Sequence, residues 1–167
     1  SKVAINYYEK AIRFQPNSAA FHVNYGLTLQ ELGRIDEAIR SFLKAIEISP
    51  KIVDGPFNLG NAFLKKEEIE TAITWYQKAI AIDPAYTEAY VNMGLALSRL
   101  GHAEEALSAY TKALELDPNQ AMAHNNLVNL LGPQGPFDEA ERHYREAIRL
   151  QPDSILFNSL HGYGAGL

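Results

Sequence analysis

The sequence predicts an all-α protein built as a tandem array of helix pairs. The first observation is a period, because five of the eight prolines, at residues 16, 50, 84, 118 and 152, follow one another at intervals of 34 residues. The second is that each interval contains two stretches in which apolar residues recur every three or four positions, as in an amphipathic helix. A repeated unit with two helices indicates a stack of helix pairs, since one pair alone cannot bury its apolar face.

These prolines, taken as position 32 of a unit, divide the chain into four complete units and two partial ones. The complete units are residues 19–52, 53–86, 87–120 and 121–154. Residues 1–18 correspond to the second helix of a partial unit, from Val3 to Phe14, and residues 155–167 to the first helix of another or to a tail. Both ends should then expose surfaces suited to stacking, as in a fragment of a longer array or in an array that associates with other copies.

Glycine marks the turn between the two helices of a unit. Gly33, Gly101 and Gly135 stand where the first helix should end, and glycine readily adopts the left-handed conformation that closes a helix. Glu67 occupies this place in the second unit. In the fourth unit the turn sequence LLGPQGPFDEA contains two prolines, so its first helix should end near Leu131.

Small residues at fixed positions predict where the two helices of a unit cross. A side chain without bulk allows close approach, and a large residue nearby fills the remaining space. Position 8 is glycine in three units and Val128 in the fourth. The other fixed residues are Ala38, Ala72, Ala106 and Ala140 at position 20, Phe42, Tyr76, Tyr110 and Tyr144 at position 24, and Ala45, Ala79, Ala113 and Ala147 at position 27.

This pattern resembles the tetratricopeptide repeat family, whose signature has glycine at position 8, alanine at 20 and 27, an aromatic residue at 24 and proline at 32. The amino-terminal partial unit agrees as well, with Ala4, Tyr8, Ala11 and Pro16. The resemblance implies a right-handed superhelical solenoid of antiparallel helix pairs with a concave groove. It also implies a scaffold that binds a protein or peptide rather than an enzyme.

In this family a stripe of the first helix, at positions 2, 5, 6, 9, 12 and 13, lines the groove. Position 6 is asparagine in every complete unit, and a carboxamide can both donate to and accept from a peptide backbone. This ladder resembles the one in the O-linked N-acetylglucosamine transferases, which hold protein substrates by their main chain. The alternative is that asparagine is only the common family choice here. The predicted peptide-binding residues are Asn24, Asn58, Asn61, Asn92, Asn126 and Asn129, with the apolar Val23, Phe57, Val91, Leu27 and Leu95.

Position 5 argues against one kind of ligand. Family members that clamp a carboxy-terminal carboxylate use lysine there and lysine or arginine farther along the groove. At position 5 this chain has Val23, Phe57, Val91 and Asn125. We therefore expect an internal segment or a helix as the ligand, with apolar contacts along the stripe.

Composition excludes several other functions. The formal net charge of −5, with basic residues scattered among acids, argues against nucleic-acid binding. No apolar run reaches the roughly 20 residues of a membrane-spanning helix. There is no cysteine, and the five histidines lack metal-ligand spacing, so no metal, cofactor or catalytic residue is expected. A cytoplasmic location is the default.

Two alternatives to a peptide-binding scaffold remain open. The first is a structural array that assembles with other copies through its open ends. The second is a substrate-recognition arm of a glycosyltransferase-type enzyme, which would need sequence beyond residue 167.

Overall fold

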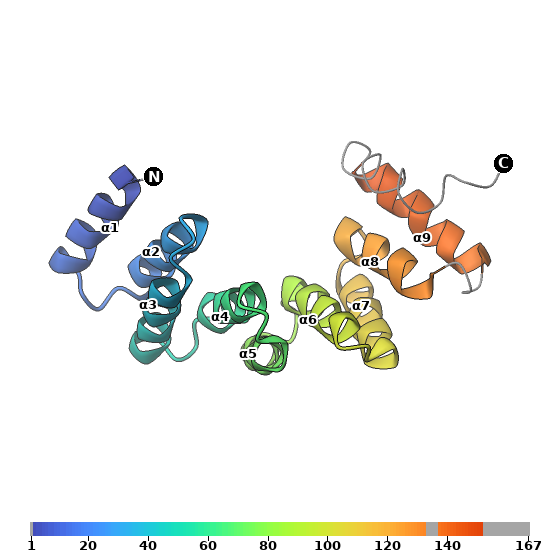
Figure 1. Cartoon of the computed structure of the whole chain (residues 1–167), viewed down its shortest axis with the longest axis horizontal. Coiled ribbons are helices and arrows are strands. Elements are labelled where there is room, and N and C mark those ends of the chain that lie inside the picture. Colours follow the sequence, from blue (N-terminus) through green and yellow to red (C-terminus); the bar gives the residue numbers. More distant parts are fainter. Residues whose placement is uncertain (1, 133–136, 152–167) are drawn as a thin grey trace.

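The computed structural model describes residues 2–132 and 137–151, and in these ranges the chain forms nine α-helices and no strand. The predicted all-α fold is confirmed. The helices follow one another along a curved row (Figure 1). They are α1 (Lys2–Phe14), α2 (Ala19–Glu31), α3 (Ile35–Ile48), α4 (Asp54–Lys65), α5 (Ile69–Ile82), α6 (Thr87–Arg99), α7 (Ala103–Leu116), α8 (Ala121–Leu131) and α9 (Phe137–Leu150).

Successive helices pack as pairs, and each pair packs on the next. Helices α2 and α3, α4 and α5, α6 and α7, and α8 and α9 are the main partners. The first helices α2, α4 and α6 also contact one another in sequence order, and they lie on the inner side of the curve, with α3, α5 and α7 outside them (Figure 1). The inner surface is therefore made of first helices.

The crossing of the helices in the first three complete units depends on the absence of a side chain at position 8. A Cβ atom on Gly60 would lie 2.4 Å from a ring carbon of Tyr76, and one on Gly94 would lie 2.6 Å from a ring carbon of Tyr110. Carbon atoms in contact are about 3.5 to 4.0 Å apart, so no other residue fits without moving the ring. Both tyrosines are fully buried as a result.

Helix α1 shows what this surface looks like without a partner helix. Its Ala4, Tyr8 and Ala11 occupy positions 20, 24 and 27, yet they remain half-buried, whereas the same positions in the next three units are fully buried. Tyr7 and Phe14 are 64% and 87% exposed. Whether this face stacks on another helix stays a prediction. The carboxy-terminal counterpart, residues 155–167, lies outside the described residues.

The turns between paired helices use the left-handed conformation that the glycines predict. Gly33 and Gly101 have φ angles of 75° and 80°, and Glu67, which replaces glycine, has 62°. Helix α8 ends at Leu131, as expected, but the left-handed residue that follows it is Gly132 (φ 60°). The prediction for Gly135 falls outside the described residues.

A polar side chain at position 4 ties the first, third and fourth complete units to the unit before each. The ring nitrogen Nε2 of His22 lies 3.1 Å from the Pro16 carbonyl oxygen, and the Tyr90 hydroxyl donates to the Pro84 carbonyl over 3.2 Å. His124 makes the same contact with Pro118 at 3.0 Å. These carbonyls follow the last turn of a helix, so the contact fixes how one pair leads into the next.

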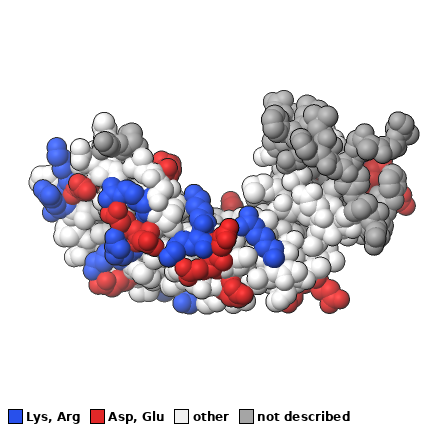
Figure 2. All heavy atoms as spheres, in the orientation of Figure 1, with Lys and Arg blue, Asp and Glu red and all other residues white. Residues whose placement is uncertain are grey.

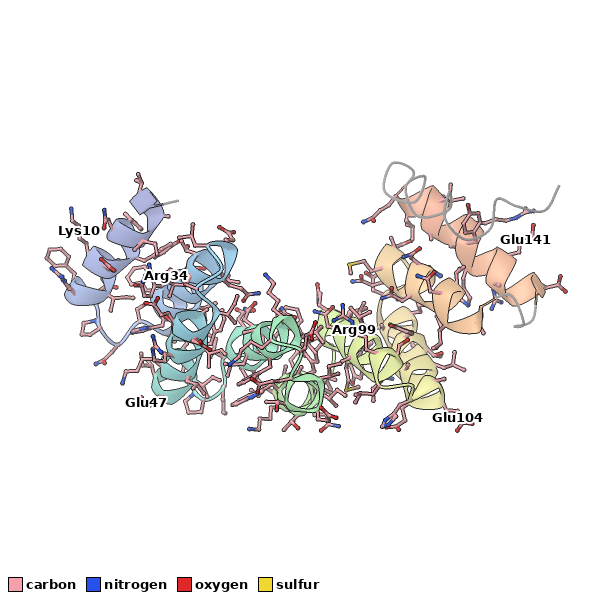
Figure 3. The ribbon with its side chains drawn as sticks, in the orientation of Figure 1. Lys10, Arg34, Glu47, Arg99, Glu104 and Glu141 are labelled. Carbon is pink, nitrogen blue, oxygen red and sulfur yellow. The ribbon has the colours of Figure 1, made fainter. Side chains whose placement is uncertain are left out.

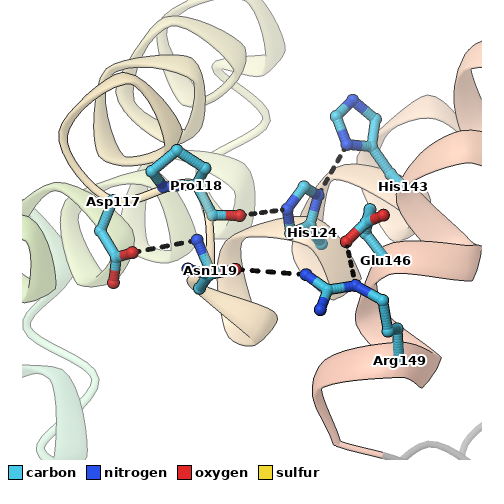
Figure 4. A network of polar contacts seen from close by, with 7 residues as sticks. All are labelled: Asp117, Pro118, Asn119, His124, His143, Glu146 and Arg149. Carbon is cyan, nitrogen blue, oxygen red and sulfur yellow. Dashed lines mark hydrogen bonds and ion pairs between the residues drawn. The ribbon is translucent and has the colours of Figure 1, made fainter.

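A buried histidine pair joins α8 to α9 (Figure 4). The Nδ1 atoms of His124 and His143 are 2.8 Å apart. Since Nε2 of His124 must carry the hydrogen that faces the Pro118 carbonyl, Nδ1 of a neutral His124 accepts the hydrogen of His143. Beside this pair, Arg149 binds Asn119 and Glu146 at 3.2 and 2.8 Å. Both rings are buried, so they contribute to the packing of α8 on α9.

Candidate functional site

Part of the predicted groove stripe is not on the surface. Val23 and Val91 at position 5 are only 5% and 3% exposed, and Asn58 is 7% exposed. The expectation that these three side chains face outward is wrong. Phe57, also at position 5, is half-buried, with its ring 6.1 Å from that of Tyr76 and 5.1 Å from that of Tyr86.

The reason is that a first helix packs against more than its own partner. Val91 belongs to a core cluster that includes Tyr110 of the same unit and Leu127 of the next. A helix in a stack must bury a sector toward its partner and further sectors toward the adjacent pairs, so its solvent-facing stripe is narrower than that of a two-helix hairpin. Position 5 falls in the buried sector.

The remaining apolar residues of the stripe lie nearer the surface. Leu27 is exposed and Leu95 is half-buried. Both are at position 9, where the second and fourth units have asparagine instead.

The four asparagines at position 6 do not form a uniform ladder. Asn24 is exposed. Asn58 donates from Nδ2 to the Asp54 carbonyl of its own helix at 2.8 Å, which satisfies it locally. Nδ2 of Asn126 is enclosed and has no partner within the described chain. Only Asn92 forms a side-chain bond to another unit.

That bond belongs to a three-residue network between the second and third units. Oδ1 of Asn61, at position 9, accepts one hydrogen bond from the Tyr76 hydroxyl and another from Nδ2 of Asn92, each 2.8 Å long. Both lone pairs of that oxygen are then used. The network fixes two carboxamide orientations, and it leaves the Asn61 amino group and the Asn92 carbonyl oxygen as the groups with unused capacity.

The surroundings of Tyr76 show how the network is embedded. Burial raises the pKa of the Tyr76 phenol above its ordinary value of 10, while the neighbouring amide of Asn92 and the positive charge of Arg99 act in the opposite direction. The phenol therefore stays protonated at neutral pH and serves as a fixed donor. Arg99 is close enough for its charge to be felt at this site.

A hollow of about 450 Å³ opens beside the network. It combines amide groups with two cationic side chains, and its walls come from the first three complete units. The lining residues are Gln30, Asn61, Leu64, Lys65, Glu67, Asn92 and Arg99.

Gln30 adds a further polar group to this wall. Its Oε1 is enclosed without a hydrogen-bond donor in the described part of the chain. An enclosed acceptor without a donor is unfavourable, so this carboxamide gains by rotating toward a donor that enters the hollow.

The two cations of the hollow differ from their neighbours. Lys65 and Arg99 are exposed and form no ion pair with any described residue, whereas Lys66 binds Asp36 at 3.0 Å and Glu68 at 3.2 Å. On the face shown in Figure 2, Lys and Arg gather over α1 to α6 with carboxylates among them, while α7 and α8 contribute few charges. Figure 3 places Arg99 on α6, at the centre of the array.

The sequence contains a signal for this pair of cations that is separate from the asparagine ladder. Lys65 and Arg99 both occupy position 13, 34 residues apart, on the same stripe as the ladder. The Tyr76 hydroxyl is the other missed participant. Its signal is a tyrosine at position 24 in a unit that has glycine at 8 and asparagine at 9, a combination found in the second unit alone.

A second hollow, of about 500 Å³, lies where α1 meets α2 and α3. Acidic and basic side chains both line it, including Glu9, Glu37 and Arg40. The basic residues Arg13 and Lys44 line it too. Glu37 is paired with Arg34 and Lys44 with Glu47, and none of the asparagines of the predicted stripe lies in this wall.

The described residues form no helix with the length and apolar composition of a membrane span. They also contain no cluster of three or more histidine, aspartate or glutamate side chains arranged to hold a metal ion.

Sequence models of one family match the chain from residue 7 to residue 142. A model described as "TPR repeat" matches residues 28–67 and 60–101. Two models described as "Tetratricopeptide repeat" match residues 87–120 in one case and residues 7–40 and 109–142 in the other. A comparison with curated protein sequences found no match.

Several solved structures are similar to this chain. MamA is 26% identical, with a TM-score of 0.76 over 91% of this chain and 89% of that one. The first TPR of Spaghetti (RPAP3), bound to the HSP90 peptide SRMEEVD, is 30% identical, with a TM-score of 0.66 over 68% of this chain and 90% of that one. A thermophilic TPR protein of Thermus thermophilus shares the fold at 20% identity, with a TM-score of 0.77 over 93% and 86% of the two chains.

Proposed function

The chain belongs to the tetratricopeptide repeat family, and we propose that it is a scaffold whose concave groove binds an extended polypeptide segment through its main chain. The observation that carries this proposal is the network of Tyr76, Asn61 and Asn92, which holds two carboxamides in fixed orientations beside a hollow.

The free groups of the network match a peptide backbone. Asn61 can donate from its amino group to a peptide carbonyl, and Asn92 can accept a peptide N–H at Oδ1. An extended backbone presents both kinds of group in alternation, whatever its side chains. Because the Tyr76 hydroxyl and the inter-unit bond already hold the two carboxamides in place, little conformational entropy is lost when a ligand binds.

A structural relative gives independent support. The first TPR of RPAP3, at 30% identity, is a structure with a bound peptide. Repeats of the same family are therefore able to bind a peptide, and this chain has exposed polar groups on its first helices.

The remaining predicted residues differ in how far they are exposed, and therefore in whether they can contact a ligand. Asn24, Leu27 and Asn129 are exposed and available for contacts farther along the groove, and Leu95 borders them as a half-buried apolar surface. The buried residues Val23, Val91 and Asn58 support the helices and do not touch a ligand. Phe57 and Asn126 are half-buried, and each contributes only the edge that reaches the surface.

Peptide display with paired variants tests the proposal. We select short unstructured peptides that the wild-type chain retains and measure their dissociation constants against Asn61→Ala combined with Asn92→Ala. Loss of two hydrogen bonds should weaken binding by about 1 to 3 kcal/mol, or roughly five- to 150-fold. Gln77→Ala is the control, because Gln77 is exposed on the second helix next to Tyr76. Equal affinity of the double variant and the wild type contradicts the proposal.

Helix α1 favours a second function, self-assembly with another copy through its uncovered apolar face. The exposed Val3, Tyr7 and Phe14 lie on a helix of the type that other units cover with a first helix. We expect a dimer in sedimentation experiments that Tyr7→Arg combined with Phe14→Arg abolishes. A monomer whose mass does not change with concentration would exclude this function.

A further inference from the structure

The hollow beside the network holds more positive charge than main-chain binding requires. Lys65 and Arg99 come from different units, both line the hollow, and neither is neutralised by an ion pair within the described chain. Glu67 is the single carboxylate in the same wall. In a chain of net charge −5, this is a local excess of positive charge at the point where we place the ligand.

From this arrangement we propose that the hollow selects segments with an acidic side chain, and that Lys65 and Arg99 hold its carboxylate while Asn61 and Asn92 hold the adjoining backbone. This inference rests on the proposed function and names the class of peptide that the groove takes.

The chemistry of the two cations suits a carboxylate. The Arg99 guanidinium can bind both carboxylate oxygens at once, and the Lys65 ammonium can approach either oxygen as a compact charge. The Asn61 amino group lies in the same wall and can donate to an oxygen that the cations leave free. A neutral side chain would leave two cations facing the hollow without a partner.

The cations of this site stand at other repeat positions than those of a clamp for a carboxy terminus. Position 5 carries no lysine, and the two cations stand at position 13, at the ends of α4 and α6. The carboxylate that we propose belongs to an internal aspartate or glutamate, so the ligand needs no free terminus.

Two pools of capped peptides test this inference. The pools share randomised flanking residues and differ only in that one has glutamate where the other has glutamine, and amidated ends remove the terminal carboxylate. We expect the wild-type chain to bind the glutamate pool about tenfold more tightly at low salt. The preference should shrink as ionic strength rises, because the two cations are exposed.

Charge variants locate the effect. Lys65→Gln combined with Arg99→Gln should bring the affinity ratio of the two pools close to one while leaving binding of the glutamine pool unchanged. Lys66→Gln is the matched control, because Lys66 is adjacent but already paired with Asp36 and Glu68, and it should preserve the preference. Melting curves confirm that each variant is folded.

The outcomes separate this inference from the proposed function. Equal binding of both pools by the wild type, or an equal loss of preference in Lys66→Gln, overturns acidic selection by the hollow and leaves main-chain binding intact. If Asn61→Ala with Asn92→Ala binds either pool as well as the wild type, main-chain binding is wrong. Binding of neither pool overturns both.

Discussion

The second and third complete units meet differently from the third and fourth, although the same repeat builds both junctions. At the first of these junctions Asn61 links Tyr76 to Asn92. At the second, Leu95 stands at the place of Asn61, so the Tyr110 hydroxyl has no hydrogen-bond partner among the described residues and Nδ2 of Asn126 is enclosed without one.

The difference teaches that, at these two junctions, the residue at position 9 decides whether the groove asparagine of one unit is linked to the tyrosine of the unit before it. Tyrosine at position 24 and asparagine at position 6 are present at both junctions, but leucine offers no acceptor to join them. The fourth unit adds a second condition. It has Asn129 and Tyr144 at positions 9 and 24, yet Val128 replaces the glycine at position 8, Tyr144 is only half-buried, and no hydrogen bond joins the two side chains.

The largest expected losses of stability come from the contact between the position-8 glycine and the tyrosine of the same unit. This contact is present in both the second and the third units. Gly60→Val and Gly94→Val should each destabilise the chain by about 1 to 3 kcal/mol, because the new side chain would overlap the ring of Tyr76 or Tyr110. Chemical denaturation measures this, with the exposed Ser108→Val as control. Only Gly60→Val should also weaken peptide binding, and equal binding losses in both variants would remove the distinction between the junctions.

Exchange of the position-9 residues tests the comparison directly. Asn61→Leu should cost about 2 kcal/mol of stability, since two hydrogen bonds of about 1 kcal/mol each disappear. Leu95→Asn should raise stability by up to about 1 kcal/mol, because it offers an acceptor to Tyr110 and Asn126. Urea denaturation of both variants gives these values. If Asn61→Leu proves neutral, Asn61 does not hold the junction together.

Alkaline pH should weaken the fold through its buried tyrosines. Burial raises the pKa of Tyr110 from 10 to about 12, so the folded chain keeps a proton that the unfolded chain loses above pH 10. Stability is therefore unaffected below pH 10 and falls as pH rises from 10 to 12, by about 1.4 kcal/mol per pH unit for this residue. Tyr110→Phe should flatten this slope in denaturation experiments. A slope identical to that of the wild type would contradict the assignment.

The smallest expected change in stability comes from removing the hydroxyl group of Tyr76 or of Tyr110 at neutral pH. Tyr76→Phe should cost about 1 kcal/mol, because Asn61 loses a donor, whereas Tyr110→Phe should change stability by only a few tenths of a kcal/mol, because no hydrogen bond is lost. Thermal unfolding of the two matched variants provides the measurement. Equal losses would show that the Tyr76 hydroxyl acts through packing alone.

The fold follows from residues whose role repeats every unit. Glycine at position 8 and an aromatic residue at position 24 meet at a crossing that recurs through the array, and Gly33 and Gly101 end their helices locally. Such features depend on short-range geometry, which a period of 34 residues repeats. The sequence therefore predicts the helix pairs, their ends and the core between them.

The candidate site follows less directly, because it depends on how neighbouring units rotate against each other. Position 5 enters the core between units, which removes Val23 and Val91 from the groove. The bonds that orient the asparagines join residues 15 and 31 positions apart, so no local pattern reveals them.

The sequence alone predicts the asparagines at position 6 of the four complete units, because one residue type recurs there at a fixed interval. Its four members nonetheless have four different surroundings, and these became visible only once the units were packed. The physical reason is that a hydrogen bond depends on where the partner lies in space, and at each junction that partner is a single residue from another helix or another unit. Asn61 supplies it to Asn92, and Leu95 cannot supply it to Asn126.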